Sequence, residues 1–284
     1  MIPTAFEYAR ATSIDDALHK LAASGDGGKL LAGGHSLVPL MKLRLSEPQM
    51  LVDISRIPEL QGVDERDGTI VIGAATVHHD VASSAVLKDR CPALAEAAAS
   101  IGDPQVRNRG TIGGSVAHAD PSADIPAVLL ALDAQIHLQS ATGTRVVAAA
   151  DFFQGLFTVD MRPDEIITRV QFVPVRSAAY AKLHQRASHY AIVGVAAALA
   201  MKDGTIATAR IGLTGATSHA IRLTAAEQVL AGQAPTPEVF ARVADAAAGA
   251  LEDVNADIHA SAEYRTAMVS VFVRRALAAA GARV

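Results

Sequence analysis

Apolar residues near the start of the chain recur with two different spacings. In residues 14–22 they repeat at i, i+3, i+4 and i+7, which predicts an amphipathic helix behind the hydroxyl cap of Ser13. The short apolar runs 29–31 and 51–54 are instead typical of buried strands, and a second helix is expected over 36–43. The order helix, strand, helix, strand indicates a small α/β unit.

The rest of the chain alternates between strand-like and helix-like patterns. Period-two alternation predicts two groups of strands, the second containing a hairpin turn at Asp203-Gly204. The last part has helical spacing and is rich in alanine, with Thr236 as the cap of one helix. The expected strands are 69–74, 134–139, 144–147, 165–173, 179–185, 190–202 and 206–213, and the expected helices are 77–87, 92–100, 125–132, 224–230, 237–251 and 262–280.

These patterns together predict an α+β protein with three parts. Residues 1–58 form the first α/β unit, and residues 59–174 form a second unit that combines helices with a sheet. Pro174-Val175-Arg176 is the expected linker. Residues 177–284 then form a C-terminal sheet covered by helices.

Composition and charge exclude several classes of function. Half of the 284 residues are apolar, and no apolar run reaches the ~18 residues of a membrane span. The net charge of −4 without Lys/Arg clusters argues against a nucleic-acid partner. The single cysteine, Cys91, excludes an internal disulfide and a cysteine-held iron–sulfur cluster within this chain. We expect a cytoplasmic protein without a signal peptide, and a peripheral position at the inner membrane face stays open.

Two glycine-rich stretches carry the candidate chemistry. The first glycine segment, residues 32–37, reads Ala-Gly-Gly-His-Ser-Leu, and the second, residues 110–115, reads Gly-Thr-Ile-Gly-Gly-Ser. Adjacent glycines let successive backbone N–H groups converge on an anion, because no Cβ blocks the approach. Each stretch alone is equally compatible with a tight connection after a strand. Two such stretches far apart in sequence indicate a diphosphate held from both sides, although neither fits the Rossmann or the P-loop pattern.

The two segments and their flanks resemble a known family. The chain is similar to the FAD-binding medium subunits of molybdenum hydroxylases, the xanthine dehydrogenase family, almost from end to end. Within that family it most resembles the carbon monoxide dehydrogenase branch, which His35 favours over relatives with Gln there. Ser115 and His189 depart from the family pattern, which more often has Asn or Asp at the first position and a carboxylate at the second. The stretches that carry the resemblance are Lys29-Leu30-Leu31-Ala32-Gly33-Gly34-His35-Ser36, Arg107-Asn108-Arg109-Gly110-Thr111-Ile112-Gly113-Gly114, Tyr264-Arg265 and Arg274-Arg275.

The resemblance implies a fold, a cofactor and a set of binding residues. The implied fold is the PCMH-type FAD-binding fold, with two α/β subdomains and a C-terminal domain like that of carbon monoxide dehydrogenase flavoproteins. FAD is the implied cofactor of this chain, which holds no catalytic acid or base and no metal site; His35, His78, His79 and His118 lack metal-binding spacing. The implied FAD-binding residues are Ala32, Gly33, Gly34, His35, Ser36, Leu37, Ile101, Gly110, Thr111, Ile112, Gly113, Gly114, Ser115, Asp124, Lys182 and Tyr190.

Several of these residues have a second interpretation. Asp124 would approach the FAD sugar, or it is the N-cap of the helix that follows it. Lys182 would lie near the cofactor, or it is a solvated strand residue. Tyr190 would screen one face of the isoalloxazine, and Ile101 would contact the flavin side, or both are core residues.

The resemblance also implies partners and a division of labour. A large subunit with a molybdopterin cofactor oxidises the substrate, a small subunit with [2Fe-2S] clusters conducts the electrons, and the FAD of this chain passes them to an external acceptor such as quinone, NAD or oxygen. The expected assembly is a dimer of heterotrimers, that is, a heterohexamer. The alternatives are a stand-alone FAD-dependent oxidoreductase and an FAD-free scaffold or binding module.

Overall fold

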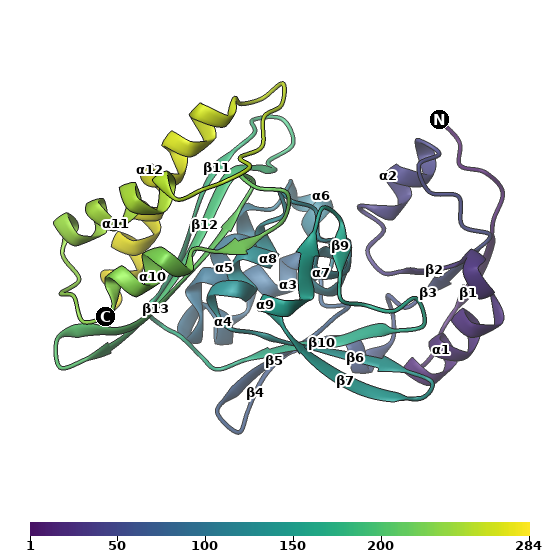
Figure 1. The fold of residues 1–284 in the computed structure, drawn as a ribbon. Helices are drawn as coiled ribbons and strands as arrows, with labels where there is room; N and C mark the ends of the chain where they lie inside the picture. Colours follow the sequence, from purple (N-terminus) through teal and green to yellow (C-terminus); the bar gives the residue numbers. More distant parts are fainter.

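The computed structural model describes residues 1–284, and its N-terminal lobe is a small parallel sheet with two helices (Figure 1). The strand order is β1-β3-β2. The expected helix, strand, helix, strand order is confirmed, and β1 was missed because its mostly exposed residues form no apolar run. The elements are β1 (Glu7–Arg10), α1 (Ile14–Ala23), β2 (Gly28–Leu31), α2 (Leu37–Lys42) and β3 (Met50–Asp53).

Helix α1 packs against the sheet of this lobe. The Ser13 hydroxyl accepts a hydrogen bond from the Asp16 N–H at 3.1 Å, which confirms Ser13 as the N-cap. Ala17, Leu18 and Leu21 of α1 are buried, and Ala17 and Leu18 belong to the small core of this lobe. Burial of these side chains holds β2 in place, and β2 leads directly into the first glycine segment.

The middle of the chain forms a five-stranded antiparallel sheet in the order β4-β5-β10-β6-β7. The expected strands of this region are confirmed, whereas the exposed β4 was missed. A separate pair, β8 and β9, forms a short hairpin. The strands are β4 (Val63–Arg66), β5 (Thr69–Gly73), β6 (Gln135–Ser140), β7 (Gly143–Ala148), β8 (Phe153–Gly155), β9 (Thr158–Val159) and β10 (Ile166–Phe172).

The helices of the middle region differ from the sequence prediction at several places, and the short helices α6 and α9 were not expected at all. The continuous helix expected over 77–87 is wrong, because Ser84 leaves the helical conformation and caps a new helix by accepting from the Leu87 N–H at 3.3 Å. The second glycine segment is largely the start of a helix rather than a turn. The helices are α3 (His78–Ser83), α4 (Ala85–Arg90), α5 (Pro92–Ser100), α6 (Pro104–Arg107), α7 (Ile112–His118), α8 (Asp124–Ala131) and α9 (Ala149–Phe152).

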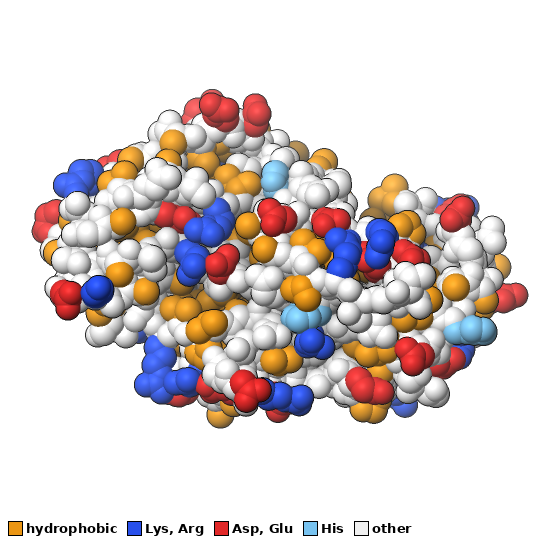
Figure 2. Space-filling model, turned by 60° about the horizontal axis from the view of Figure 1, so that its bottom comes forward, with side chains coloured by type: hydrophobic (Ala, Val, Ile, Leu, Met, Phe, Trp, Pro, Cys, Tyr) orange, Lys and Arg blue, Asp and Glu red, His pale blue; other side chains and the backbone are white.

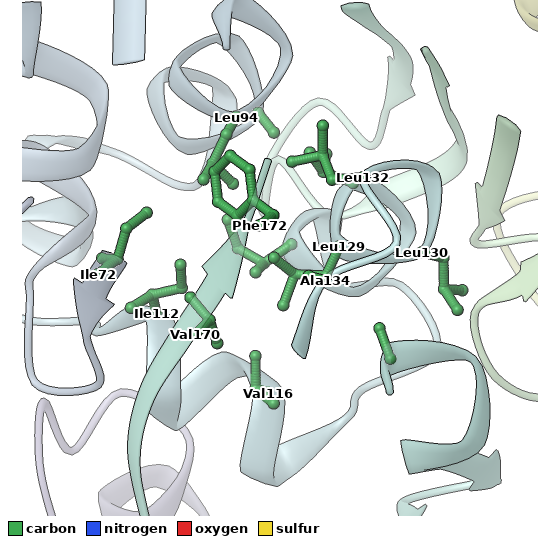
Figure 3. Packing of buried hydrophobic residues seen from close by; sticks show 14 of the residues in the cluster. Ile72, Leu94, Ile112, Val116, Leu129, Leu130, Leu132, Ala134, Val170 and Phe172 are labelled. Carbon is green, nitrogen blue, oxygen red and sulfur yellow. The ribbon is translucent and has the colours of Figure 1, made fainter. Parts of the chain in front are cut away.

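The main hydrophobic core lies between the middle sheet and these helices (Figure 3). Ile72 from β5 and Val170 and Phe172 from β10 contribute the sheet side. Leu94 from α5 and Leu129 from α8 contribute the helix side. Burying side chains of this size is worth roughly 1.5–3 kcal/mol each. The core therefore gives α7 and the second glycine segment a rigid base.

The C-terminal part is a four-stranded antiparallel sheet, β11-β12-β13-β14, that is covered on both faces (Figure 1). Helices α10, α11 and α12 form a second core with one face, and α5 and α8 contact the sheet on the other. Gly212 allows the close approach of α8, because a Cβ there would lie 1.9 Å from the Ala127 carbonyl oxygen. The elements are β11 (Ala178–His184), β12 (Ala191–Lys202), β13 (Thr205–Thr214), β14 (Ile221–Arg222), α10 (Thr224–Leu230), α11 (Pro237–Gly249) and α12 (Ala262–Gly281).

The expected strands and helices of this part are confirmed. The hairpin turn is also where it was expected, since Asp203 and Gly204 both have positive φ, +51° and +75°. On the face of the molecule shown in Figure 2, acidic and basic side chains are interspersed and no basic stripe forms. None of the helices combines the length and the apolar character needed to cross a membrane.

Candidate FAD-binding site

A cleft of about 490 Å³ brings together segments that are far apart in sequence. The N-terminal lobe contributes the end of β2 and the first glycine segment. The middle region contributes His78, the second glycine segment and Asp124, and the loop between β11 and β12 contributes Tyr190. All of the sequence-predicted FAD-binding residues except Ile112 and Lys182 therefore line one cavity.

The two glycine segments touch each other at Gly33. A Cβ on Gly33 would lie 2.0 Å from the Arg109 carbonyl oxygen and 2.8 Å from the Gly110 Cα. Only glycine permits this backbone-to-backbone contact. Gly34 has a second reason to be glycine, because its φ is +77°. The contact fixes the position of the N-terminal lobe against the middle region at the floor of the cleft.

The first glycine segment carries a row of unpaired backbone donors. None of the N–H groups from Ala32 to Leu37 donates to another backbone group, although the carbonyls of Gly34 and Ser36 accept the first bonds of α2. Ser36 is the N-cap of α2, and its side chain makes no capping hydrogen bond. Consecutive free N–H groups that lead into a helix are well suited to bind an anion, which is consistent with the sequence prediction.

Most N–H groups of the second glycine segment are already paired, which corrects one part of the prediction. The Ile112 N–H donates to the Thr76 carbonyl and the Gly113 N–H to the Ala74 carbonyl, at 3.0 and 2.8 Å. The Gly114 N–H donates to the Thr111 hydroxyl oxygen at 3.1 Å. This segment is therefore suited to support a ligand mainly through its hydroxyls and its lack of side chains rather than through a row of free backbone N–H groups.

The N-cap at Thr111 gives a direct test of this structural role. Thr111→Val keeps the shape of the side chain but removes the acceptor of the Gly114 N–H, so we expect a loss of about 1 kcal/mol in the free energy of unfolding. Urea denaturation measures this loss. Thr111→Ser should retain most of the stability, and a Thr111→Val protein as stable as the wild type would contradict the assigned cap.

Of the sequence-predicted binding residues, Ile112 and Lys182 do not line the cleft, whereas all the others do. Ile112 is fully buried and points into the main core beside Ile72 and Val170 (Figure 3). Its place inside the motif gave no sign of this, because helix α7 turns its side chain away from the glycines. Ile101 lines the cleft and also packs against the main core, so its packing role is confirmed and its contact with the flavin stays a prediction.

Lys182 is a buried link between three elements. Its Nζ lies 2.9 Å from the Asp124 Oδ1 and donates to the carbonyls of Ser100 and His189, at 2.9 and 2.8 Å. Both side chains of the Lys182–Asp124 pair are 5% exposed. The alternative of a solvated strand residue is therefore wrong, and Lys182 instead holds the β11–β12 loop against α5 and α8.

Asp124 is the buried partner of this lysine and not a helix cap. It is the first residue of α8, where Ala123 occupies the N-cap position. The Tyr180 hydroxyl donates to its carboxylate at 2.5 Å, and Gly194 on the next strand leaves room for that hydroxyl. Burial raises the pKa of Asp124, while Lys182 and Tyr180 oppose the rise. The Asp124 side chain thus joins the cleft wall to the C-terminal sheet.

Tyr190 lies at the mouth of the cleft on the β11–β12 loop. Tyr190 is 46% exposed, which rules out the alternative of a core residue. His189 before it has a positive φ of +61° and stacks on His184 with ring centroids 5.2 Å apart. This loop conformation, together with Lys182, sets the position of the Tyr190 ring.

Sequence reasoning missed His78 as a site residue. Its side chain is buried, its Nδ1 has no hydrogen-bond partner, and it lines the cleft beside Gly110. Burial lowers its pKa to about 4, and the nearby His35 adds to the effect. No spacing in the sequence could reveal this, because the contact with the second glycine segment is long-range.

The cleft matches what FAD needs. The free N–H groups and the hydroxyls suit a diphosphate, and the buried unpaired His78 nitrogen is a polar group without a partner in the protein. The apolar wall with Tyr190 at the mouth suits an aromatic ring system. FAD bound here would supply redox chemistry that no side chain of this chain provides.

Comparison with protein families agrees with this geometry. Residues 4–175 match the family described as "FAD binding domain in molybdopterin dehydrogenase". Residues 178–280 match the family described as "CO dehydrogenase flavoprotein C-terminal domain". The two matches together span nearly the whole chain.

Individual relatives match over their full length. The chain is 42% identical to the carbon monoxide dehydrogenase medium chain of Hydrogenophaga pseudoflava, covering 100% of this chain and 99% of the relative. It is 41% identical to the 6-hydroxypseudooxynicotine dehydrogenase complex subunit alpha of Paenarthrobacter nicotinovorans, covering 99% and 96%. A solved structure of the Hydrogenophaga pseudoflava carbon monoxide dehydrogenase superimposes with a TM-score of 0.95 at 44% identity, covering 100% and 99%. The chain therefore belongs to the FAD-binding medium subunits of molybdenum hydroxylases, and it is an oxidoreductase subunit with carbon monoxide dehydrogenase medium chains among its near relatives.

Proposed function

We propose that this chain is the electron-exit subunit of a heterotrimeric molybdenum hydroxylase. Its FAD receives electrons from [2Fe-2S] clusters of a small subunit and passes them to an external acceptor, while a molybdopterin large subunit oxidises the substrate. The observation that carries the proposal is the cleft with its row of free N–H groups, in a chain that matches medium subunits over their whole length.

The chemistry of the single cysteine supports this division of labour. Cys91 is buried, and burial raises the pKa of its thiol to about 12. A thiol that stays protonated in the core is not a cluster ligand, since clusters are held by several thiolates. The clusters of the proposed complex therefore belong to a different chain.

The binding roles within the cleft are part of the proposal. The first glycine segment would hold the diphosphate through its backbone N–H groups, with the hydroxyls of Thr111 and Ser115 on the other side. Asp124 would lie toward the sugar and Tyr190 toward the isoalloxazine. In the proposed domain division, residues 1–58 and 59–174 hold FAD between them and residues 177–284 form the C-terminal domain.

This chain does not determine the substrate. The chain is 42% identical to a medium chain of a carbon monoxide dehydrogenase and 41% identical to a subunit of a 6-hydroxypseudooxynicotine dehydrogenase. Such equal similarity is expected when substrate recognition belongs to another subunit. The acceptor, whether quinone, NAD or oxygen, would approach at the open mouth of the cleft.

Purification of the tagged chain from its native host tests the proposal. We expect non-covalent FAD, iron–sulfur absorption, molybdenum and two co-purifying chains, assembled as a dimer of heterotrimers. A solitary chain with FAD but without iron and molybdenum would favour a stand-alone flavoenzyme. A chain without flavin under any condition would leave a scaffold or binding module.

Tyr190 offers a second test within the complex. Tyr190→Ala should retain FAD, because Tyr190 is half-exposed and belongs to neither glycine segment. The rate at which reduced FAD is reoxidised should change, and stopped-flow absorbance measures it. Tyr264→Ala, at an exposed tyrosine outside the cleft, is the matched control. An unaltered reoxidation rate in the Tyr190 variant would contradict the proposed role of Tyr190 at the flavin.

A further inference from the structure

His78 is the one side chain of the cleft floor whose burial has no explanation within the protein. It is the first residue of α3 and is 4% exposed. Its backbone N–H donates to the Gly110 carbonyl at 2.8 Å, so its position is locked to the second glycine segment. Its Nδ1 is buried without any partner. A buried polar ring in a well-packed protein normally has a hydrogen-bond partner.

The orientation of the ring is fixed by its neighbours. The edge formed by Cδ2 and Nε2 faces Gly110, where a Cβ would come within 2.9 and 3.2 Å of these two atoms. Nδ1 is fully buried, so of the two ring nitrogens only Nε2 can be reached from the cleft that His78 lines. A larger residue at position 110 would cover that edge. The glycine therefore keeps Nε2 accessible from the cleft.

The protonation of the ring follows from the same contacts. Desolvation disfavours the imidazolium, and the nearby His35 disfavours it further, so the ring is neutral at physiological pH. A buried N–H without an acceptor is rarer than a buried unsatisfied acceptor. The single proton therefore belongs on Nε2, which makes His78 a donor directed into the cleft.

We propose that His78 donates a hydrogen bond from Nε2 to a phosphate oxygen of the bound dinucleotide, between the two glycine segments. This inference rests on the proposed placement of the diphosphate. It gives the middle region a donor at the place where the N–H groups of Ile112, Gly113 and Gly114 are already used. The diphosphate is then held by backbone donors of the N-terminal lobe and by a side-chain donor of the middle region.

The test compares FAD binding in three variants of the full chain within its complex. Loss of a hydrogen bond to a charged group predicts about 10- to 100-fold weaker FAD binding for His78→Leu. His78→Gln, whose amide nitrogen reaches toward the position of Nε2, should recover most of the affinity. His79→Leu is the matched control, because the neighbouring His79 is exposed and does not line the cleft.

A second readout separates a phosphate contact from a merely structural role. FAD that still binds to His78→Leu at saturating concentration should show the wild-type visible spectrum and flavin potential, because the isoalloxazine is not touched. Unchanged FAD affinity, failure of the Gln variant to recover it, or a shifted flavin spectrum would each overturn the inference. A wild-type complex that binds no FAD would instead overturn the proposed function.

Nitrogen NMR on the wild-type protein tests the tautomer independently of any variant. With histidine labelled at both ring nitrogens, we expect the His78 signals of a neutral ring protonated at Nε2. The Nε2 signal should move when FAD is added to the flavin-free protein. A ring protonated at Nδ1 would contradict the proposed donor.

Discussion

Gly33→Val is expected to abolish FAD retention. The would-be Cβ lies 2.0 Å from the Arg109 carbonyl oxygen, so any side chain at this position forces the two glycine segments apart. Backbone atoms held by a core on each side cannot yield as a flexible side chain can. The free N–H groups of the first segment would then lose their position relative to the second.

The measurement is the molar ratio of flavin to protein after gel filtration, with the FAD dissociation constant by fluorescence. We expect at least about tenfold weaker binding, corresponding to more than about 1.4 kcal/mol. Gly249→Ala is the control, because Gly249 has an ordinary φ and nothing within 4 Å of its would-be Cβ. Normal flavin content in pure, folded Gly33→Val would contradict the contact between the segments as the basis of the site.

Gly114→Val, in the second glycine segment, should act differently from Gly33→Val in the first. The only atom near its would-be Cβ is the Thr111 Oγ1, at 2.8 Å. A valine there is expected to disturb the Thr111 cap and to protrude where the ligand approaches. FAD affinity should therefore fall more than stability, and the two are compared by flavin titration and urea denaturation. A Gly114→Val protein that loses stability but binds FAD with wild-type affinity would contradict this arrangement.

Local patterns in the sequence were sufficient for most of the fold. Helix α1 and the hairpin at Asp203-Gly204 follow from spacing, capping and turn chemistry, which act over a few residues. The break at Ser84 was missed because an apolar pattern continues across it, and only the side chain's bond to the Leu87 N–H shows that a new helix begins. Exposed strands such as β1 were missed because sheet pairing, not burial, defines them.

The same distinction between local patterns and long-range contacts applies to the candidate site. Glycine chemistry indicated the first glycine segment as an anion site, since consecutive free N–H groups are a local property. The second segment was assigned the same role, although the N–H groups of Ile112 and Gly113 bond to the loop after β5, a contact between distant parts of the chain. His78 and the buried pairing of Lys182 were invisible for the same reason. Long-range packing decides what a polar side chain contacts.

Lys182→Met is expected to destabilise the protein by about 3–5 kcal/mol at neutral pH, because it leaves the buried Asp124 carboxylate without its cation. It also removes the donor that holds the carbonyls of Ser100 and His189. Urea denaturation measures the loss. Lys202→Met, at an exposed strand end without an ion pair, is the matched control and should change stability little.

The pH dependence of this variant identifies the cause. Burial raises the folded-state pKa of Asp124 above its unfolded value, so the folded state binds the proton more readily and stability falls as pH rises through that interval. Loss of Lys182 raises the folded-state pKa further and extends the interval upward. The penalty should therefore shrink as pH falls and Asp124 becomes protonated, and Lys182→Met with Asp124→Asn should recover part of the stability at neutral pH. A penalty that is the same at all pH values and unaffected by Asp124→Asn would assign the loss to packing of the lysine stem instead of to the buried charge.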